Sequence, residues 1–491
     1  MADEWEQIDS GGWVDTGEVE PEREEAAPQE EASSLEAASS SGGDEWEQID
    51  SGGWVDTGEV EPVPAAAAPK TSTLAKAAAA PKPAPSPGRG FFDTFFAGEF
   101  WSIGFLMVVL LLAGLTWYAY SSNNVGLTGI VVGVLIGFGF QKGRFCIYMA
   151  HREILLMKNW EMMKALILTI LLIMVGYLFV SDQGIGLMSD VTDGTFTAIS
   201  PRPAIWLAAL VGGFIFGIGT VLAGGCAAGT TYRAGEGYIG NMVAVVTLML
   251  GASIGMFGVL SPMIGELKKT AFKYTPLHAS EPISNPTVYD ILLKEFGISA
   301  WYTAAAIIFL VAIIWILKSG FSLPQIMPKG GFKLENIMKH KWTKWKAGVF
   351  IAFVVVGGLL THSAAQALSG QGHNYSVCAA CGLVRFTNNY FSTNGNLFEW
   401  SGLMMVGLVL GAFISAQFSG EFGLRVPEGK IILQAGLGGF LMGLGAVAAL
   451  GCTVGHILSG APALSIGSLI GWFSIAVGIM VTTYYMFMRD M

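Results

Sequence analysis

The chain has 491 residues, of which 52% are hydrophobic and only 13% are charged. Soluble globular proteins carry about 25% charged residues, so this composition excludes an ordinary soluble enzyme, and the mean hydropathy of +0.54 indicates a polytopic membrane protein. Five cysteines in a chain of this length also exclude a disulfide-rich scaffold. The net charge of −10 is unevenly spread, because residues 1–90 hold 20 of the 37 acidic residues and 5 of the 27 basic ones.

Residues 1–90 are expected to form a disordered acidic tail. The 19-residue motif DEWEQIDSGGWVDTGEVEP occupies residues 3–21 and returns unchanged at 44–62, and a Pro/Ala-rich linker follows it. Each copy sets two tryptophans among carboxylates, which is typical of a short motif that docks on a basic, grooved partner protein, and two copies would add avidity. The alternative is a duplicated disordered segment that has no partner.

The rest of the chain is expected to be all α-helical and to cross the membrane about ten times. A spanning helix needs about 20 mainly apolar residues, and the sequence offers ten such segments, some of them short or rich in glycine. The candidate spans are 101–120, 126–141, 162–180, 203–223, 238–260, 298–317, 347–368, 400–418, 431–450 and 464–488.

Basic residues predict the orientation of these spans. Lysines and arginines gather at 141–164 and at 318–346, and the positive-inside rule places both segments in the cytoplasm. Both termini are then cytoplasmic as well, and the acidic loop 181–202 faces outward.

Two glycine-rich segments, 212–240 and 438–469, resemble each other. Both open with GGF, continue with a G-x-G pair, and end their apolar run with Gly-Cys, at Gly225–Cys226 and at Gly451–Cys452. The two runs cross the expected topology in opposite directions, which is the pattern of an inverted repeat with a transport site near the midplane. The alternative is that glycine-rich helices resemble each other by composition alone.

Three cysteines, Cys146, Cys226 and Cys452, end apolar segments and are flanked by small residues. A chain break inside the membrane exposes N–H groups at the start of the next half-helix, and these groups favour an anion. A thiol also contacts soft sulfur atoms well. Together these features favour a small sulfur-containing oxyanion as the ligand, although cysteine is also a common small hydrophobic residue of buried helices.

The motifs GFGFQKGRFC, AGGCAAGT and LGCTVGH resemble the three cysteine motifs of the YeeE/YedE family of bacterial inner-membrane proteins, whose characterised members take up thiosulfate. The resemblance covers roughly residues 126–488. It implies an hourglass-like helical fold with inverted halves and re-entrant half-helices, and it implies that thiosulfate passes along a relay of Cys146, Cys226 and Cys452. Some relatives in this family are linked to selenium metabolism, so a selenium-bearing substrate stays an alternative.

The chain departs from the family plan in three segments. These are the tail at 1–90, an extra first helix within 91–125, and an insertion at 369–398 in the transport domain 126–491. The insertion contains C-A-A-C, with Cys378 and Cys381. This pair has three readings: a structural disulfide, a sulfur-accepting dithiol at the pore mouth, or half of a metal site. The metal site would need His362 and His373, whose spacing matches no tight zinc pattern, so no bound metal is expected.

Several polar residues near the breaks are candidates for substrate binding. Arg233, seven residues after Cys226, is either a pathway residue or a structural partner of Glu236. His456 follows Cys452 by four residues and could contact the substrate, or it could simply be satisfied by the backbone. Gly225 and Gly451 would let the backbone approach the ligand closely.

Two further groups of charged residues are expected to be less specific. Arg144, two residues before Cys146, either attracts an anion or anchors the positive side of the protein. His151, Arg152 and Glu153 are expected to lie on a solvated cytoplasmic turn.

The sequence thus predicts an importer of thiosulfate or a related small sulfur anion, and not an enzyme. It carries no G-x-x-x-x-G-K-[ST] motif, and no cofactor or nucleic acid is expected. The tail would dock a cytoplasmic protein such as a sulfurtransferase. The alternatives are a membrane sulfur-transfer protein that acts through cysteine persulfides and a scaffold that acts through its tail.

Overall fold

The structure is a computed structural model of the whole chain. It describes thirteen stretches, and all statements below concern these. The described residues are 5–8, 12–15, 46–48, 54–56, 101–122, 124–182, 202–275, 277, 283, 285–319, 338–369, 377–391 and 399–489.

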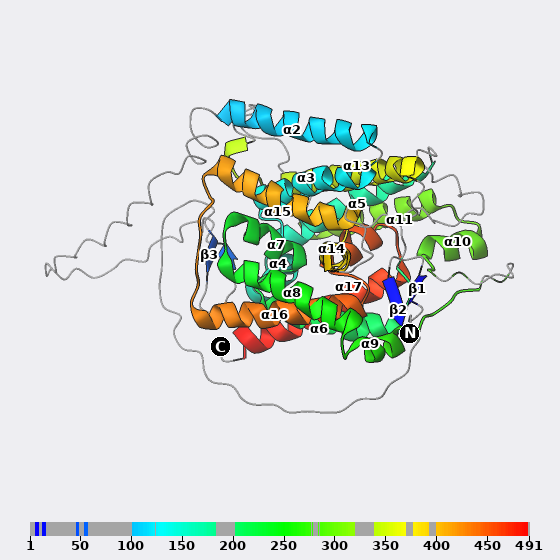
Figure 1. Cartoon of the computed structure of the whole chain (residues 1–491). Coiled ribbons are helices and arrows are strands. Elements are labelled where there is room, and N and C mark those ends of the chain that lie inside the picture. The colour runs from blue at the N-terminus through cyan, green and yellow to red at the C-terminus, as the bar shows by residue number, and fades with distance from the viewer. Residues whose placement is uncertain are drawn as a thin grey trace, which may run out of the picture.

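Helices make up almost all of the described body (Figure 1). Long helices are interspersed with shorter ones, and the breaks at Cys146, Cys226 and Cys452 separate a long helix from a short helical segment. The long helices are α2 (Trp101–Ser121), α3 (Thr128–Gly143), α5 (Glu161–Asp182), α6 (Trp206–Leu222), α8 (Ile239–Phe257), α11 (Ala300–Ser319), α13 (Lys344–Ser369), α15 (Trp400–Ser419), α16 (Gly429–Ala448) and α17 (Ile466–Phe487). The shorter ones are η1 (Val125–Leu127), α4 (Ile147–Met157), α7 (Ala227–Glu236), α9 (Ser261–Lys268), α10 (Val288–Phe296), α14 (Ala379–Phe391) and the π-helix η3 (Gly455–Gly460).

The predicted membrane architecture is confirmed. Nine helical segments of the described chain are long and apolar enough to cross a membrane. A tenth candidate is the bent pair α10 and α11, whose axes differ by 119° at the break between Phe296 and Ala300. The first long helix, α2, lies at the edge of the bundle beside α3 (Figure 1), and only 11% of its apolar span is buried inside the structure.

The two similar glycine-rich segments pack around a pseudo-two-fold axis between α6 and α16. A Cβ on Gly212 would lie 2.9 Å from the carbonyl oxygen of Gly445, and a Cβ on Gly438 would lie 2.7 Å from that of Gly219. The sequence repeat pairs Gly212 with Gly438 and Gly219 with Gly445, so these two contacts are symmetry equivalents. Only glycine permits such close backbone contact, which explains why both segments keep it at the same places.

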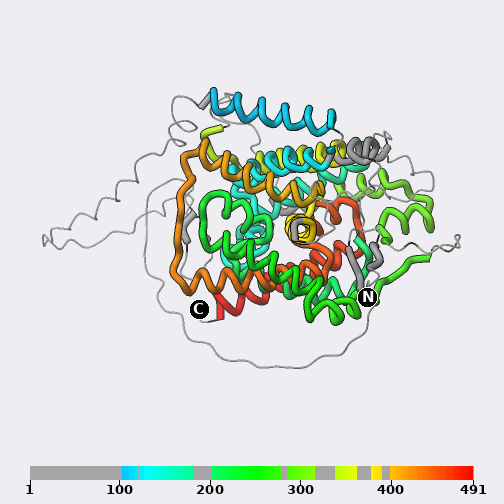
Figure 2. The backbone as a smooth tube through the Cα atoms, in the orientation of Figure 1, coloured from blue at the N-terminus to red at the C-terminus, as the bar shows by residue number. Residues whose placement is uncertain are grey.

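The outer helices follow the same symmetry. Helix α16 packs along α8, and its equivalent α6 packs along α17. In the other part of the bundle α3 packs along α15, and α13 packs along α5. The short helix α14 is seen end-on at the centre of the bundle in Figure 2, so the segment that carries C-A-A-C contributes to the middle of the protein.

One expectation about the segment after Cys146 is wrong. His151, Arg152 and Glu153 do not form a solvated turn, because they lie on α4 and are almost fully buried. Their polar groups contact protein instead of water: the His151 Nδ1 is 2.9 Å from the Ile147 carbonyl oxygen, and Lys344 Nζ lies 3.4 Å from Glu153 Oε2. The charged residues of this segment belong to a buried half-helix, which their composition did not predict.

The described residues of the tail form two antiparallel hairpins, one in each copy of the repeated motif. The first joins β1 (Trp5–Ile8) to β2 (Gly12–Asp15), and the second joins β3 (Trp46–Gln48) to β4 (Trp54–Asp56). Trp5 pairs with Asp15 in the first copy, and Trp46 pairs with Asp56 in the second. Identical sequences thus adopt the same strand register.

Candidate functional site

Four of the short helical segments begin directly after a cysteine. Cys146 is the N-cap residue of α4 and Cys226 is the N-cap residue of α7. Cys452 comes directly before the helical segment 453–460, and Cys378 comes directly before α14. The first N–H groups of a helix have no partner within the helix, so each of these sulfurs lies at a source of hydrogen-bond donors.

Backbone N–H groups use three of these sulfurs as acceptors. The N–H of Gly229 donates to Cys226 Sγ over 3.4 Å, and the N–H of Gly455 donates to Cys452 Sγ over 3.5 Å. In α14 the N–H of Cys381 donates to Cys378 Sγ over 3.2 Å. Each donor lies three residues after its cysteine, which is the geometry of a side-chain N-cap. The partial positive charge at these helix starts favours electron-rich ligands.

The motif cysteines Cys146 and Cys226 meet at one glycine. A Cβ on Gly229 would lie 3.1 Å from Cys146 Sγ and 3.5 Å from Cys226 Sγ. Both side chains are almost fully buried and neither forms a disulfide. The absence of a side chain at Gly229 therefore leaves the space in which the two thiols face each other.

The third motif cysteine, Cys452, lies in a second group with the C-A-A-C pair. Cys378 and Cys381 form a disulfide, which was the first of the three readings considered for them. The Cys452 Sγ is a free thiol that lies 3.6 Å from Cys378 Sγ. His362 and His373, which the metal-site reading requires, have side chains outside the described part of the structure.

The two groups are linked through Thr453, whose side chain lies close to the Cys226 thiol. The five sulfurs of the chain consequently follow one another through the bundle. Their order is Cys381, Cys378, Cys452, Cys226 and Cys146. The sequence separates these residues by as much as 306 positions, so the fold alone brings them into one row.

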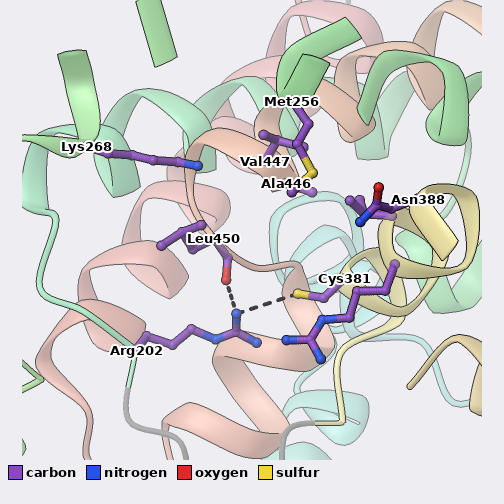
Figure 3. Close-up of a pocket in the computed structure, with 10 residues that line it drawn as sticks. Arg202, Met256, Lys268, Cys381, Asn388, Ala446, Val447 and Leu450 are labelled. Carbon is purple, nitrogen blue, oxygen red and sulfur yellow. Dashed lines mark hydrogen bonds between the residues drawn. The ribbon is translucent and has the colours of Figure 1, made fainter. Parts of the chain in front are cut away.

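A pocket adjoins the Cys381 end of the row (Figure 3). We call it the cationic pocket, because Arg202, Lys268 and Arg385 line it and none of its ten described lining residues carries a carboxylate. Arg202 donates to the carbonyl oxygen of Leu450 and lies with Nη1 3.5 Å from Cys381 Sγ. Arg385 is paired with Glu399, outside the lining, at 2.9 Å.

Burial sets the charge state of two of these cations. It lowers the pKa of Lys268 to about 8 and that of Arg202 to about 10. Arg202 therefore stays charged at neutral and mildly alkaline pH, whereas Lys268 loses its charge at mildly alkaline pH. The pocket is positively charged at neutral pH and suits a small anion.

Ion pairs fill the opposite end of the row, beyond Cys146. Arg144 Nη1 lies 3.3 Å from Glu236 Oε2, and Arg144 Nη2 lies 3.0 Å from Glu421 Oε2. Arg233, which was expected to pair with Glu236 or to line the pathway, donates from Nη1 to the carbonyl oxygen of Gly224 over 2.6 Å. A Cβ on Gly225 would lie 3.2 Å from the same Nη1, so this glycine makes room for the guanidinium.

His456 occupies a slot between two glycines. A Cβ on Gly451 would lie 2.5 Å from its Nε2, and a Cβ on Gly471 would lie 2.7 Å from its Cε1. The imidazole is fully buried, and neither ring nitrogen has a hydrogen-bond partner within the described residues. The missing side chain of Gly451 therefore makes room for the ring of His456.

The cations of the pocket were not among the sequence candidates. Arg202 stands between two prolines at the end of the loop 181–202, which the sequence analysis placed outside. The available signal for Arg202 was a single basic residue at the end of a loop whose other charged residues are acidic. Lys268 and Arg385 gave no such signal, since nothing in the sequence reveals that α9 and α14 meet at one pocket.

The fold and this site define a multi-pass membrane protein with buried cysteines and helix N-termini along one row. Residues 142–481 match the family model described as sulphur transport. That match covers well over half of the chain, and the chain belongs to this family. The resemblance to the YeeE/YedE proteins seen in the sequence motifs is thereby confirmed.

Relatives of known name agree with this assignment. The chain is 33% identical over 372 residues to the thiosulfate transporter TsuA of Spirochaeta thermophila, covering 74% of this chain and 99% of the relative. It is 29% identical over 367 residues to the thiosulfate transporter TsuA of Escherichia coli K12, covering 74% of this chain and 95% of the relative. A shorter similarity, 30% over 138 residues, links it to the probable transporter YedE of Escherichia coli K12 and covers 27% of this chain and 31% of the relative.

Proposed function

We propose that the protein imports thiosulfate, or a closely related small sulfur-containing anion, across a bacterial inner membrane. The observation that carries the proposal is the single row of sulfurs from the cationic pocket to the ion pairs at the opposite end. The relatives of known name support thiosulfate as the anion.

The pocket is the proposed site of capture. Arg202, Lys268 and Arg385 attract the dianion electrostatically. Helix N–H groups at Gly455 and Gly229 then supply donors for its oxygens. The sulfane sulfur is passed between Cys452, Cys226 and Cys146 by non-covalent contacts, so no bond is made or broken in transit.

The direction of transport follows from the proposed orientation. Lys142 and Lys341 lie with Arg144 at the ion-pair end, and positive charge marks the cytoplasmic side of a membrane protein. The cationic pocket then opens outward. Because no nucleotide-binding motif is present, consumption of the anion inside or an ion gradient drives the import.

Among the other sequence candidates, Arg233 and His456 have separate proposed roles. Arg233 holds the turn before Cys226 through the Gly224 carbonyl oxygen. His456 keeps two unpartnered ring nitrogens close to the Cys452 turn, and we assign it a contact with the passing anion. Gly225 and Gly451 act indirectly, since they make room for these two side chains.

Growth on thiosulfate as the sole sulfur source tests the proposal. The host lacks its own sulfate and thiosulfate importers and expresses wild type, Cys226→Ala or residues 91–491 alone, with membrane insertion checked by immunoblot. If wild type and the truncation grow but Cys226→Ala does not, the result supports import by residues 91–491 and a regulatory role for the tail. Failure of correctly inserted wild type would reject thiosulfate and favour a selenium-bearing anion or persulfide-based sulfur transfer.

The tail has a separate proposed role as a docking segment for a cytoplasmic protein, such as a sulfurtransferase. The shared register of the two strand pairs favours it, because both copies of the motif have the same backbone pairing. Two equivalent modules on one chain raise the effective concentration for a bivalent partner. Removing only residues 3–21 should weaken capture of the partner by the purified tail far more than twofold, whereas a scrambled spacer should not.

A further inference from the structure

Cys452 and the Cys378–Cys381 disulfide are arranged as reactants. The free thiol of Cys452 lies 3.6 Å from Cys378 Sγ, which is van der Waals contact between two sulfurs. Thiol–disulfide exchange needs a thiolate, a disulfide sulfur within reach and a stabilised leaving sulfur. The described residues supply a free thiol with N–H donors around it, a disulfide sulfur in contact with it and a cation beside the leaving sulfur.

The attacking sulfur is Cys452. Its Sγ accepts hydrogen bonds from the N–H groups of Ala380 and Gly455, each at 3.5 Å. The first donor belongs to α14 and the second to the segment 453–460, so the starts of two helices converge on one sulfur. Such donors stabilise a thiolate. Cys452 is fully buried. Among the described residues, the sulfur that it contacts is Cys378 of the disulfide.

The leaving sulfur is Cys381. It is only partly buried, it lines the cationic pocket, and its Sγ lies 3.5 Å from Arg202 Nη1. Arg202 reaches this position from a different part of the chain and is held by the Leu450 carbonyl oxygen (Figure 3). A guanidinium at this distance stabilises the negative charge that develops on a departing thiolate.

We propose that Cys378 is the centre of an intramolecular thiol–disulfide exchange between Cys452 and Cys381. The Cys452 thiolate attacks Cys378 Sγ, a Cys378–Cys452 bond forms, and the Cys378–Cys381 bond breaks. The electron pair of the broken bond stays on Cys381, which takes up the proton that Cys452 released. One thiol and one disulfide are present before and after, so the step requires no oxidant or reductant.

The exchange moves the free thiol from Cys452, in the middle of the sulfur row, to Cys381 at the pocket. Before it, Cys452 is a free thiol in the row and the pocket presents a disulfide. Afterwards, Cys452 is bonded and a thiol at Cys381 faces the pocket. The consequence for transport rests on the proposed function, because the first state leaves the relay complete and the second removes one member from it.

Alkylation of the purified full-length protein tests the exchange without any substrate. The protein is kept free of reductant, treated with iodoacetamide, quenched in acid and digested for mass spectrometry of disulfide-linked peptides. Because Cys381 is more accessible than Cys452, labelling draws the equilibrium toward the exchanged form. The expected product carries carbamidomethyl on Cys381 and a Cys378–Cys452 bond, and it accumulates with time.

Cys452→Ser is the decisive control, since it removes the attacking sulfur and leaves the disulfide in place. It should reduce Cys381 labelling by about tenfold or more. Equal labelling of Cys381 in wild type and in this variant would show that the disulfide is opened by something other than Cys452. Wild-type protein that retains the Cys378–Cys381 bond while Cys452 becomes labelled would also overturn the proposal.

A second pair of variants covers the case in which Cys452→Ser fails to fold. Cys381→Ser leaves Cys378 and Cys452, which should join when glutathione disulfide is added. Cys378→Ser leaves Cys381 and Cys452 and should form about tenfold less of its bond. Equal yields from the two variants would reject the assigned centre. These assays do not depend on uptake, so they can succeed or fail independently of the growth test.

Discussion

Arg144 at the end of α3 lies 3.3 Å from the carboxylate of Glu236, the last residue of α7. The same guanidinium lies 3.0 Å from Glu421, just beyond α15. The side chain of Glu236 is 1% exposed and that of Arg144 is 14% exposed, so their ion pair is largely shielded from water. It fixes the half-helix that carries Cys226 against two long helices at the ion-pair end.

Replacing Glu236 with glutamine should therefore destabilise the protein. The variant leaves Glu421 as the described carboxylate partner of Arg144, and breaking a buried ion pair costs up to about 3 kcal/mol. We expect the melting temperature in detergent to fall by several degrees. Glu266→Gln is the matched control, because its pair with Lys269 is exposed and contributes little. Equal melting temperatures for the two variants would contradict the role of the Arg144 network.

Gly229→Ala should impair uptake without preventing insertion. The new Cβ would lie 3.1 Å from Cys146 Sγ, so the two facing thiols must shift. We expect the uptake rate to fall about tenfold, since misplacement by about 1 Å at a well-oriented site costs up to about a hundredfold. Uptake of labelled thiosulfate into membrane vesicles measures this. Gly357→Ala, where the Cβ meets open space, should transport like wild type.

Uptake should weaken as the external pH rises from about 7 to 9. Lysine is charged only below its pKa, and burial lowers the pKa of Lys268 to about 8, so the cationic pocket loses one positive charge over this interval. Arg202, with a pKa of about 10, keeps its charge over most of this interval. We expect KM to rise with little change in the maximal rate. Lys268→Arg should flatten the profile, and an unchanged profile in that variant would assign the pH dependence to another group.

Gly445→Ala should disrupt the axis between α6 and α16. Its Cβ would lie 2.5 Å from the Phe216 nitrogen and 2.6 Å from the Gly212 carbonyl oxygen, and neither backbone can yield locally. Overpacking of this kind costs about 1–3 kcal/mol, which thermal unfolding in detergent detects. Gly114→Ala on α2, with nothing within 4 Å, serves as the reference. A variant as stable as that reference would show that the two helices can separate at little cost.

Local signals in the sequence predicted the helices and the breaks. The apolar runs, the Gly-Cys ends and the positions of Cys146, Cys226 and Cys452 all follow from composition and spacing. Which thiols would meet was not predictable. Cys146 faces Cys226 because Gly229 leaves space between them, and Cys452 meets Cys378 because α14 enters the centre of the bundle. Such contacts depend on how distant helices pack.

The burial of charged residues was the main feature that the sequence analysis predicted wrongly. The run from His151 to Glu153 has the composition of a water-exposed turn, yet it is buried on α4. Its partners, Lys344 and Trp472, lie 191 and 321 residues away from the residues they contact. A polar segment can be buried when residues far away in the sequence form hydrogen bonds or ion pairs with it. No local sequence pattern predicts which residues these are.

The donors that face Cys226 and Cys452 are main-chain N–H groups of Gly229 and Gly455. Alanine scanning leaves a main-chain amide in place, so a side-chain scan at these glycines reports the space around them and not the contribution of their N–H groups. That contribution emerges only when the amide itself is replaced, for example by an ester linkage introduced through an α-hydroxy acid. These hydrogen-bond donors belong to the path of the backbone, and side-chain substitution at these helix starts cannot isolate their importance.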